Sequence, residues 1–308
     1  MVNFLTVLDP VLRALLNFYG LRSQSIEIEP GTVVHFWGPS QISENYTSQN
    51  NQAKSANHLE KPALVLLHGF AATGVLTWLL QIMAFSGTYA VFVPDLIFFG
   101  DSTTHSANRS PEYQAECLAK GLKRLGVERC TVVGCSYGGI IGSKMAVLEP
   151  ELVRCLVLSN SNVAITELQS EEAFERIGSR SWPELMLPET VEGLRKLLGA
   201  VIFKRPWLPD WAYKHFLEVM FDSRQERAEL LKALVIKDKD FAVPKFSQKI
   251  CVMAGEEDKI FTPEIVQKTK AQLGDKATIH VIKKAGHLVH LERPFVYNRL
   301  LKKSLTNL

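Results

Sequence analysis

The chain has 308 residues, of which 46% are hydrophobic and 22% charged. This balance is typical of a soluble globular protein with one large core, with room for an insertion. The net charge is +3 and the sequence has no long basic run, which argues against nucleic acid as a partner. The five cysteines show no C-x-x-C spacing, which favours a reducing, cytoplasmic compartment.

Residues 1–22 are predicted to contain a short helix. Asp9 suits the N-cap and Pro10 the first helical position. The segment lacks the basic start and the small-residue cleavage site of a signal peptide, and Asp9, Pro10 and Arg13 interrupt it too much for a membrane span. Because apolar side chains cover much of its circumference, we expect it to pack on the body, with peripheral contact to a membrane surface as the open alternative.

Strands and helices alternate through the first half of the chain. Two strands, 25–29 and 32–37, join at Pro30-Gly31 and precede a polar loop, 38–61. Continuous apolar runs with amphipathic segments between them then indicate a parallel sheet covered on both faces. The predicted order is strand 63–67, helix 75–85, strand 89–93, helix 111–125, strand 130–133, helix 137–148 and strand 155–159.

The alternation breaks after residue 163. The next eighty or so residues suggest helices near 168–177, 188–203, 209–221 and 224–235, and no convincing strand. The pattern resumes with strand 249–254, a helix from 263, strand 278–282 and a last helix over 289–303. We therefore predict an N-terminal helix (1–22), an α/β core (23–163 and 244–308) and a helical cap (164–243).

The passage from strand to helix around Ser136 carries most of the functional information. Gly134-Cys135-Ser136-Tyr137-Gly138 fits G-x-S-x-G, in which a tight strand-to-helix turn presents a serine hydroxyl. Ser136 would lie at a positive helix N-terminus, with the N–H of Tyr137 directed at an oxyanion. His68-Gly69-Phe70 ends the strand 63–67 at the same sheet edge, so the N–H of Phe70 is the expected second donor.

A base and an acid are expected at the ends of later strands. Gly255-Glu256-Glu257-Asp258 follows one of them, and we choose Asp258 because the chain re-enters packed structure just after it; Glu257 remains an alternative. The passage 159–162, Ser-Asn-Ser-Asn, holds no carboxylate.

His287 follows the last strand and is the predicted base, with His290 as the weaker candidate. The other histidines in strands and helices, including His35, are interpreted as structural.

Together these residues resemble the α/β-hydrolase superfamily over the chain from Thr32 onward. The resemblance rests on His68-Gly69, on Pro94-Asp95-Leu96 leading to Gly100-Asp101-Ser102, on the elbow, on 255–258, and on Gly286-His287 followed by Glu292-Arg293-Pro294. It implies an eight-stranded, mostly parallel sheet flanked by helices, a helical cap after the sixth strand, and a triad of Ser136, Asp258 and His287. The lidded form with an N-terminal helix is similar to plant esterase and lipase-like members related to monoacylglycerol lipases.

The predicted function is therefore hydrolysis of carboxylic esters through an acyl-enzyme, without metal or organic cofactor. An aspartate stands at the elbow in relatives that open epoxides, so Ser136 argues against that activity. Apolar or medium-chain acyl esters, including monoacylglycerol-like ones, would suit aromatic walls predicted from Phe98, Phe99, Trp182, Trp207 and Trp211. Two alternatives stay open, namely a carbon–carbon bond hydrolase with the same triad and a slow-turnover receptor for a small molecule. The sequence leaves the oligomeric state open.

Overall fold

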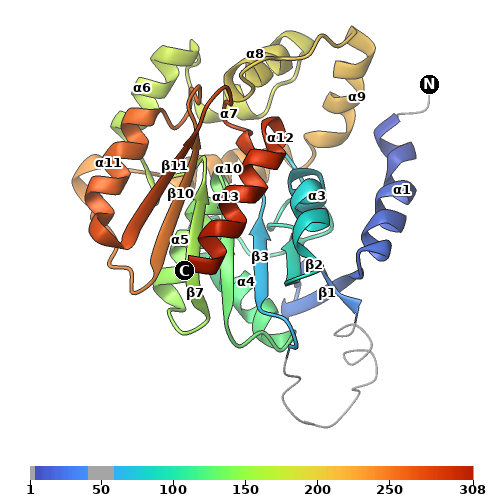
Figure 1. Ribbon diagram of the computed structural model, residues 1–308. Coiled ribbons are helices and arrows are strands. Elements are labelled where there is room, and N and C mark those ends of the chain that lie inside the picture. Colours follow the sequence, from blue (N-terminus) through green and yellow to red (C-terminus); the bar gives the residue numbers. More distant parts are fainter. Residues whose placement is uncertain (1–3, 41–58, 308) are drawn as a thin grey trace.

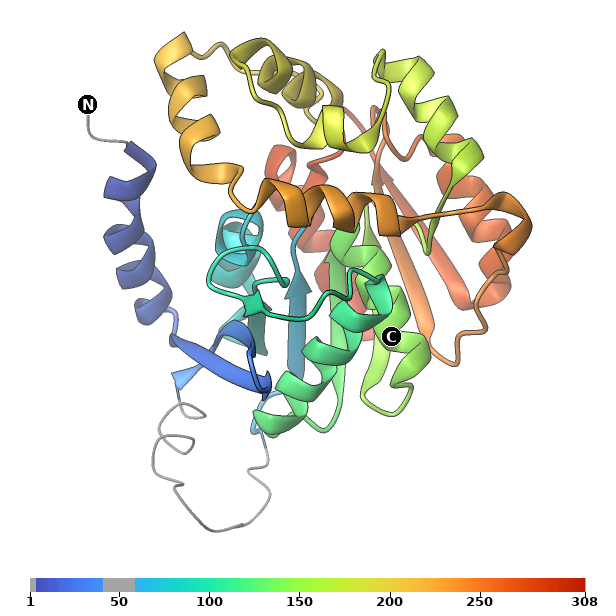
Figure 2. The same cartoon turned by 180° about the vertical axis from the view of Figure 1, so that it is seen from behind.

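The computed structural model describes residues 4–40 and 59–307, with side chains from residue 8 onward (Figure 1). Most of the predicted polar loop, residues 41–58, lies outside the described residues. The described part forms a central sheet between two layers of helices, with further helices above one edge of the sheet (Figures 1 and 2). This is the arrangement that alternating buried strands and amphipathic helices predict.

Eight strands follow one another across the sheet in the order β1-β2-β4-β3-β6-β7-β10-β11. The pairs from β4 to β11 are parallel, while β1 and β2 form an antiparallel hairpin that joins the sheet at β4. The predicted eight-stranded, mostly parallel sheet is confirmed, and a short strand, β5, pairs with β2 beside it. Their bounds are β1 Leu21–Glu29, β2 Thr32–Pro39, β3 Ala63–Leu67, β4 Ala90–Pro94, β5 Thr103–Thr104, β6 Cys130–Cys135, β7 Val153–Ser159, β10 Lys249–Gly255 and β11 Ala277–Ile282.

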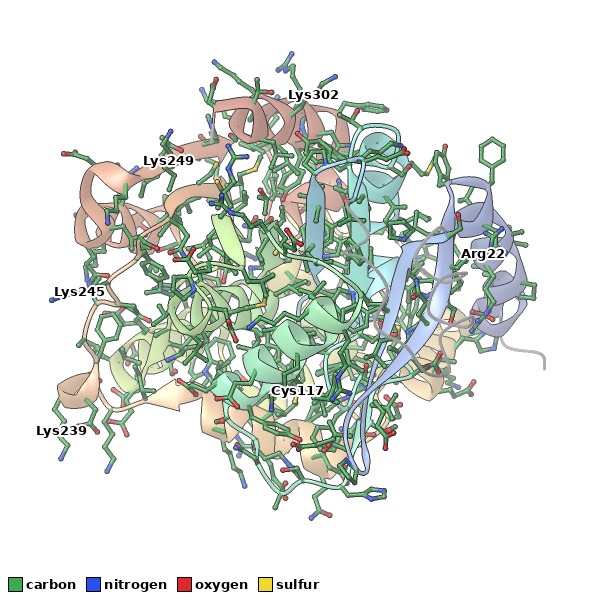
Figure 3. All side chains as sticks on the ribbon, turned by 90° about the horizontal axis from the view of Figure 1, so that it is seen from below. Arg22, Cys117, Lys239, Lys245, Lys249 and Lys302 are labelled. Carbon is green, nitrogen blue, oxygen red and sulfur yellow. The ribbon has the colours of Figure 1, made fainter. Side chains whose placement is uncertain are left out.

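Two hydrophobic clusters occupy the two faces of the sheet. One contains residues of α4 (Pro111–Arg124), α5 (Tyr137–Leu148) and α11 (Pro263–Leu273), and the other contains residues of α1 (Phe4–Phe18), α3 (Gly74–Phe85) and α13 (Pro294–Asn307). The view from below separates these layers, with Lys302 on α13 at one side of the sheet and Cys117 on α4 at the other (Figure 3). Burial on both faces explains why each central strand is a continuous apolar run.

The segment between β7 and β10 lies over the carboxyl edge of the parallel strands (Figure 1). We call residues 164–243 the cap segment. It contains α6 (Glu167–Ile177), α7 (Trp182–Met186), α8 (Val191–Val201), α9 (Asp210–Met220), α10 (Arg224–Leu234) and a short 3₁₀ turn, Asp238–Asp240. Its ends meet in a two-residue parallel pair, β8 (Ile165–Thr166) with β9 (Val235–Ile236). The expectation of no strand here is therefore wrong, because a two-residue bridge leaves no periodic pattern.

Two predicted helix boundaries are also wrong. The N-terminal helix begins at Phe4, so Pro10 lies inside it rather than at its first turn. The last helix is broken into α12 (Val289–Glu292) and α13, because Pro294 has no N–H to continue the ladder and instead begins a new helix.

Candidate active site

The elbow between β6 and α5 holds Ser136 in a strained backbone conformation. Its φ is 51° and its ψ is −118°, a region that L-residues rarely occupy. A Cβ on Gly138 would collide with the carbonyl group of His68, so the elbow and the turn after β3 can approach this closely only with glycine at that position. The strained turn leaves Ser136 half-buried at the N-terminus of α5.

The turn after β3 places its backbone beside the elbow. A Cβ built on Gly69 would lie 3.5 Å from the Cβ of Ser136. Within the described residues, neither Phe70 nor Tyr137 donates its backbone N–H to a protein acceptor. Neither N–H group is used by the described part of the fold, and their role as donors to an oxyanion next to Ser136 stays a prediction.

The side chain of His68 is neutral and holds this turn in place through two hydrogen bonds. Burial lowers the pKa of His68, and its Nε2 accepts a hydrogen bond of 2.9 Å from the backbone N–H of Leu96. The proton is then on Nδ1, which donates to the carbonyl oxygen of Gly69 at 2.7 Å. His68 thus links the turn carrying Phe70 to the loop that follows β4.

Asp258 and His287 form a buried pair at the same edge. Asp258 Oδ2 lies 2.9 Å from His287 Nδ1, and Oδ1 accepts the backbone N–H groups of Ile260 at 2.8 Å and Phe261 at 3.1 Å. The ring of Phe261 also stacks on the imidazole, with 5.8 Å between centroids. Glu256 and Glu257 are exposed, in agreement with the choice of Asp258. The contact leaves Nε2 as the imidazole nitrogen that can exchange a proton with a substrate or nucleophile.

Asn160 connects this pair with the elbow, and the sequence analysis missed it. The residue before it, Ser159, accepts the backbone N–H of Ser136 at 3.0 Å, while the Asn160 side-chain amide donates to Asp258 Oδ2 at 2.7 Å and to the carbonyl oxygen of Gly286 at 3.1 Å. Its φ of 45° is one that asparagine tolerates well. The passage 159–162 holds no carboxylate, and the relevant signal in it is an amide side chain at a strand end.

Glu292 is a second residue whose role the sequence did not reveal. One carboxylate oxygen accepts the N–H of Gly286 at 2.8 Å, next to His287, and the other accepts the N–H of Phe203 at 2.9 Å. A further bond of 3.2 Å joins the N–H of Leu288 to the carbonyl oxygen of Val201. The loop that carries His287 is therefore attached to the end of α8 in the cap segment.

Two arginines hold Phe98 and Phe99, the residues of the predicted aromatic wall, in place. Phe99 is buried against Phe70, at 5.1 Å between ring centroids, and Phe98 has a positive φ of 72°. Arg227 of α10 donates to the carbonyl oxygen of Phe98 at 2.8 Å and lies 4.3 Å above the Phe99 ring, while Arg109 lies 4.5 Å above the Phe98 ring. Both guanidinium groups are paired, Arg227 with Asp222 and Arg109 with Glu229.

The three predicted tryptophans are placed differently. Trp182 is buried within the cap segment, where its indole N–H donates to Ser170 Oγ at 3.0 Å and its ring packs on Phe174. Trp207 and Trp211 are 85% and 51% exposed. Trp207 lines an open cavity of about 730 Å³ with Arg205 of the same connecting segment and with residues of α8 and α9, a set that contains none of Ser136, Asp258 and His287. The prediction that these tryptophans form a substrate wall is not supported, because aromatic composition alone does not tell which side of a helix is covered.

His290, the weaker candidate for the base, is fully buried beside Trp78. Burial, and then the charge of His287, lower the pKa of His290 to about 3. Its Nδ1 faces Cys135 Sγ at 4.0 Å. A histidine that stays neutral and enclosed cannot serve as a base near neutral pH, which favours His287.

The described residues contain no group of three or more His, Cys, Asp or Glu side chains that could hold a metal ion. The arrangement instead joins a strained hydroxyl at a helix N-terminus, two backbone amide donors and an aspartate-bound imidazole at one sheet edge. Such a set can support nucleophilic attack on a carbonyl group.

Several known proteins are similar to this chain. The chain is 28% identical over 255 residues to 2-hydroxy-6-oxononadienedioate/2-hydroxy-6-oxononatrienedioate hydrolase of Burkholderia vietnamiensis, covering 79% of this chain and 86% of the relative. It is 25% identical over 245 residues to Lipase 1 of Psychrobacter immobilis, covering 78% and 75% of the two chains. Among solved structures, a membrane phospholipase A described as a bacterial virulence factor superposes with a TM-score of 0.76 at 22% identity, covering 99% of this chain and 91% of the other.

The model of the alpha/beta hydrolase fold family matches residues 62–294, from the strand before the His68 turn to the residue that begins α13. This match includes the elbow, Asp258 and His287. The chain therefore belongs to the alpha/beta hydrolase fold family.

Proposed function

We propose that the protein is a serine hydrolase that cleaves carboxylic esters with apolar or medium-chain acyl groups, such as monoacylglycerol-like esters. The observation that carries the proposal is the buried hydrogen bond between His287 and Asp258, at the same sheet edge as a serine in a strained elbow. Such strain is retained where the surrounding structure enforces it, which is typical of a functional position.

In the proposed mechanism, Ser136 Oγ attacks the ester carbonyl carbon while His287 Nε2 accepts its proton. Asp258 keeps the imidazole oriented and stabilises its charged form. The backbone N–H groups of Phe70 and Tyr137 hold the tetrahedral oxyanion, and His287 then donates the proton to the leaving alcohol. A water molecule activated by His287 hydrolyses the acyl-enzyme and restores Ser136.

The charges around the aromatic wall favour an uncharged substrate. Arg227 and Arg109, the two cations that contact Phe98 and Phe99, are already neutralised by Asp222 and Glu229. A dianionic substrate would have to compete with these carboxylates for the two arginines, whereas an apolar acyl chain would not.

The second candidate function is carbon–carbon bond hydrolysis of meta-cleavage products. It is supported by the relative from Burkholderia vietnamiensis, which covers most of both chains. Both reactions would use Ser136 as the nucleophile and His287 as the base. The two activities would therefore differ only in which substrate binds beside Phe98 and Phe99.

Turnover of p-nitrophenyl esters by wild type, Ser136→Ala and Ser143→Ala would test the proposal. Ser143 is a suitable control because it lies on the same helix and its buried hydroxyl only donates to the carbonyl oxygen of Gly139, at 2.9 Å. We expect Ser143→Ala to retain turnover and Ser136→Ala to lose it. Near-native turnover by Ser136→Ala would refute the mechanism. Turnover of a meta-cleavage product without ester turnover would favour the second function.

A further inference from the structure

Helix α1 has an apolar face that is wider than the surface on which it packs. At roughly 100° per residue, its apolar positions from residue 8 onward span about 200° of the circumference. The remaining arc holds Asp9, Arg13, Asn17 and Pro10. The apolar positions are Leu8, Val11, Leu12, Ala14, Leu15, Leu16 and Phe18, and Tyr19 follows directly after the helix.

Only half of this face is covered by the body of the protein. Leu16 is fully buried in the cluster with Leu21 and Trp37, and Leu12 is half-buried. On the outer half, Leu8, Val11 and Phe18 are 44%, 61% and 82% exposed. With helical spacing Val11 and Phe18 form one outward stripe, with Leu8 at its border toward α9, and such an exposed apolar stripe marks an interaction surface.

The cap segment extends this surface. Helix α9 lies beside α1 in both views (Figures 1 and 2), and a cleft of about 270 Å³ between them is lined by Leu8 on one side and Val219 on the other. Val219 is 39% exposed, and Trp211 in the first turn of α9 and Trp207 in the segment before it are exposed as well. Aliphatic and aromatic side chains of two helices thus form one outer edge.

Exposed basic residues border the same edge. Arg22 lies near the C-terminal end of α1 (Figure 3), while Lys204 and Arg205 lie in the segment before α9 and Lys214 lies in α9. Two of the nearby carboxylates are neutralised, Asp9 by Arg13 and Asp210 by Arg195. Exposed aromatic and aliphatic side chains flanked by cations suit the boundary between acyl chains and anionic headgroups.

We propose that the outer stripe of α1, together with the exposed edge of α9, docks on the surface of a bilayer that contains anionic phospholipid. Val11 and Phe18 enter the boundary region, and the flanking cations face the headgroup phosphates. The surface is built on two neighbouring helices, α1 and α9, and a planar interface can contact both without a matching groove. No helix in the described part of the chain is long and apolar enough to cross a membrane, so this docking is peripheral.

Flotation of the full chain with vesicles tests the docking surface. The vesicles are phosphatidylcholine alone and phosphatidylcholine with phosphatidylserine, and the variant is Val11→Glu with Phe18→Glu. Phe295→Glu is the matched control, because Phe295 is 89% exposed but lies at the start of α13. We expect wild type and Phe295→Glu to float with the anionic vesicles and the double variant to partition at least about tenfold more weakly.

Circular dichroism and thermal unfolding should be alike for the three proteins, since the substituted positions are exposed. Three outcomes would overturn the proposal: a wild type that floats with neither vesicle, a double variant that partitions like wild type, or a control that is impaired as much as the double variant. Concentration-dependent dimerisation that the double variant abolishes, without any flotation, would instead assign the stripe to a second copy of the chain.

Discussion

Two histidines of this protein make nearly the same contact with a buried aspartate. His287 Nδ1 lies 2.9 Å from Asp258, and His35 Nδ1 lies 3.0 Å from Asp95. The second pair even has a serine at its other nitrogen, since Ser23 Oγ is 2.8 Å from His35 Nε2. A serine–histidine–aspartate sequence of hydrogen bonds therefore occurs at a place where we propose no chemistry.

The difference lies in the backbone around the serine. Ser23 is the third residue of β1, where it pairs with Trp37 in an antiparallel ladder. Ser136 instead precedes a helix, with a positive φ and two unused amide groups beside it. Asp95 accepts further hydrogen bonds from Gly74 and Asp101, so this pair ties β2 to the loop after β4. Triad-like distances thus do not define a nucleophile without a strained elbow and oxyanion donors.

The largest expected effect separates the two serines. Ser136→Ala should lower kcat for an ester by about 10⁴- to 10⁶-fold, because it removes the proposed nucleophile, and Ser23→Ala should change it by less than about twofold. Steady-state kinetics of both variants measure this contrast. A comparable loss in Ser23→Ala would mean that the wrong hydroxyl has been assigned.

Disrupting the pair of His287 and Asp258 should lower kcat, whereas disrupting the pair of His35 and Asp95 should lower the stability of the fold. Asp258→Asn should lower kcat by about 10³- to 10⁴-fold, since the amide no longer holds the imidazole in the required tautomer. His35→Asn should leave kcat within a few-fold but lower the free energy of unfolding by about 1–3 kcal/mol, because Asp95 loses a buried partner. Kinetics and urea unfolding of both variants would sharpen the comparison, and an inactive but stable His35→Asn would contradict it.

Asn160 should act as a positioning residue with a smaller effect. Glycine also tolerates the positive φ of 45° at this position. Asn160→Gly therefore removes only the side-chain amide that contacts Asp258 and Gly286. We expect kcat to fall by roughly tenfold with KM little changed, in line with the loss of one charge-assisted hydrogen bond. A change confined to KM would indicate instead that Asn160 contacts the substrate.

The smallest contrast concerns the response to acid. The pKa of His290 is lowered to about 3, so below about pH 6.5 the unfolded chain binds a proton at this residue that the folded protein does not. The stability that depends on a neutral His290 is fully present above about pH 6.5 and is lost as the pH falls toward 3. Between pH 6.5 and 4.5, the free energy of unfolding should fall by about 2 to 3 kcal/mol through this residue. Urea unfolding across this range should show a flatter dependence for His290→Phe than for wild type, and parallel curves would contradict this assignment.

Patterns that many residues share could be predicted from the sequence. Each central strand is a continuous apolar run, and the elbow, the His68 turn and the loops of Asp258 and His287 follow strand ends in the expected order. Contacts made by one side chain across the fold could not be predicted. Asn160 reaches a residue 98 positions away, and Arg227 reaches one 129 positions away. The exposure of Trp207 likewise depends on which side of the cap helices is covered, and composition does not encode this.

The most direct test of the central claim is to locate the serine that a fluorophosphonate labels, by mass spectrometry of the digested protein. We predict a single adduct on the peptide containing Ser136, equally strong in His35→Asn and lost in His287→Gln. An adduct on Ser23, or undiminished labelling of Ser136 in His287→Gln, would contradict the account.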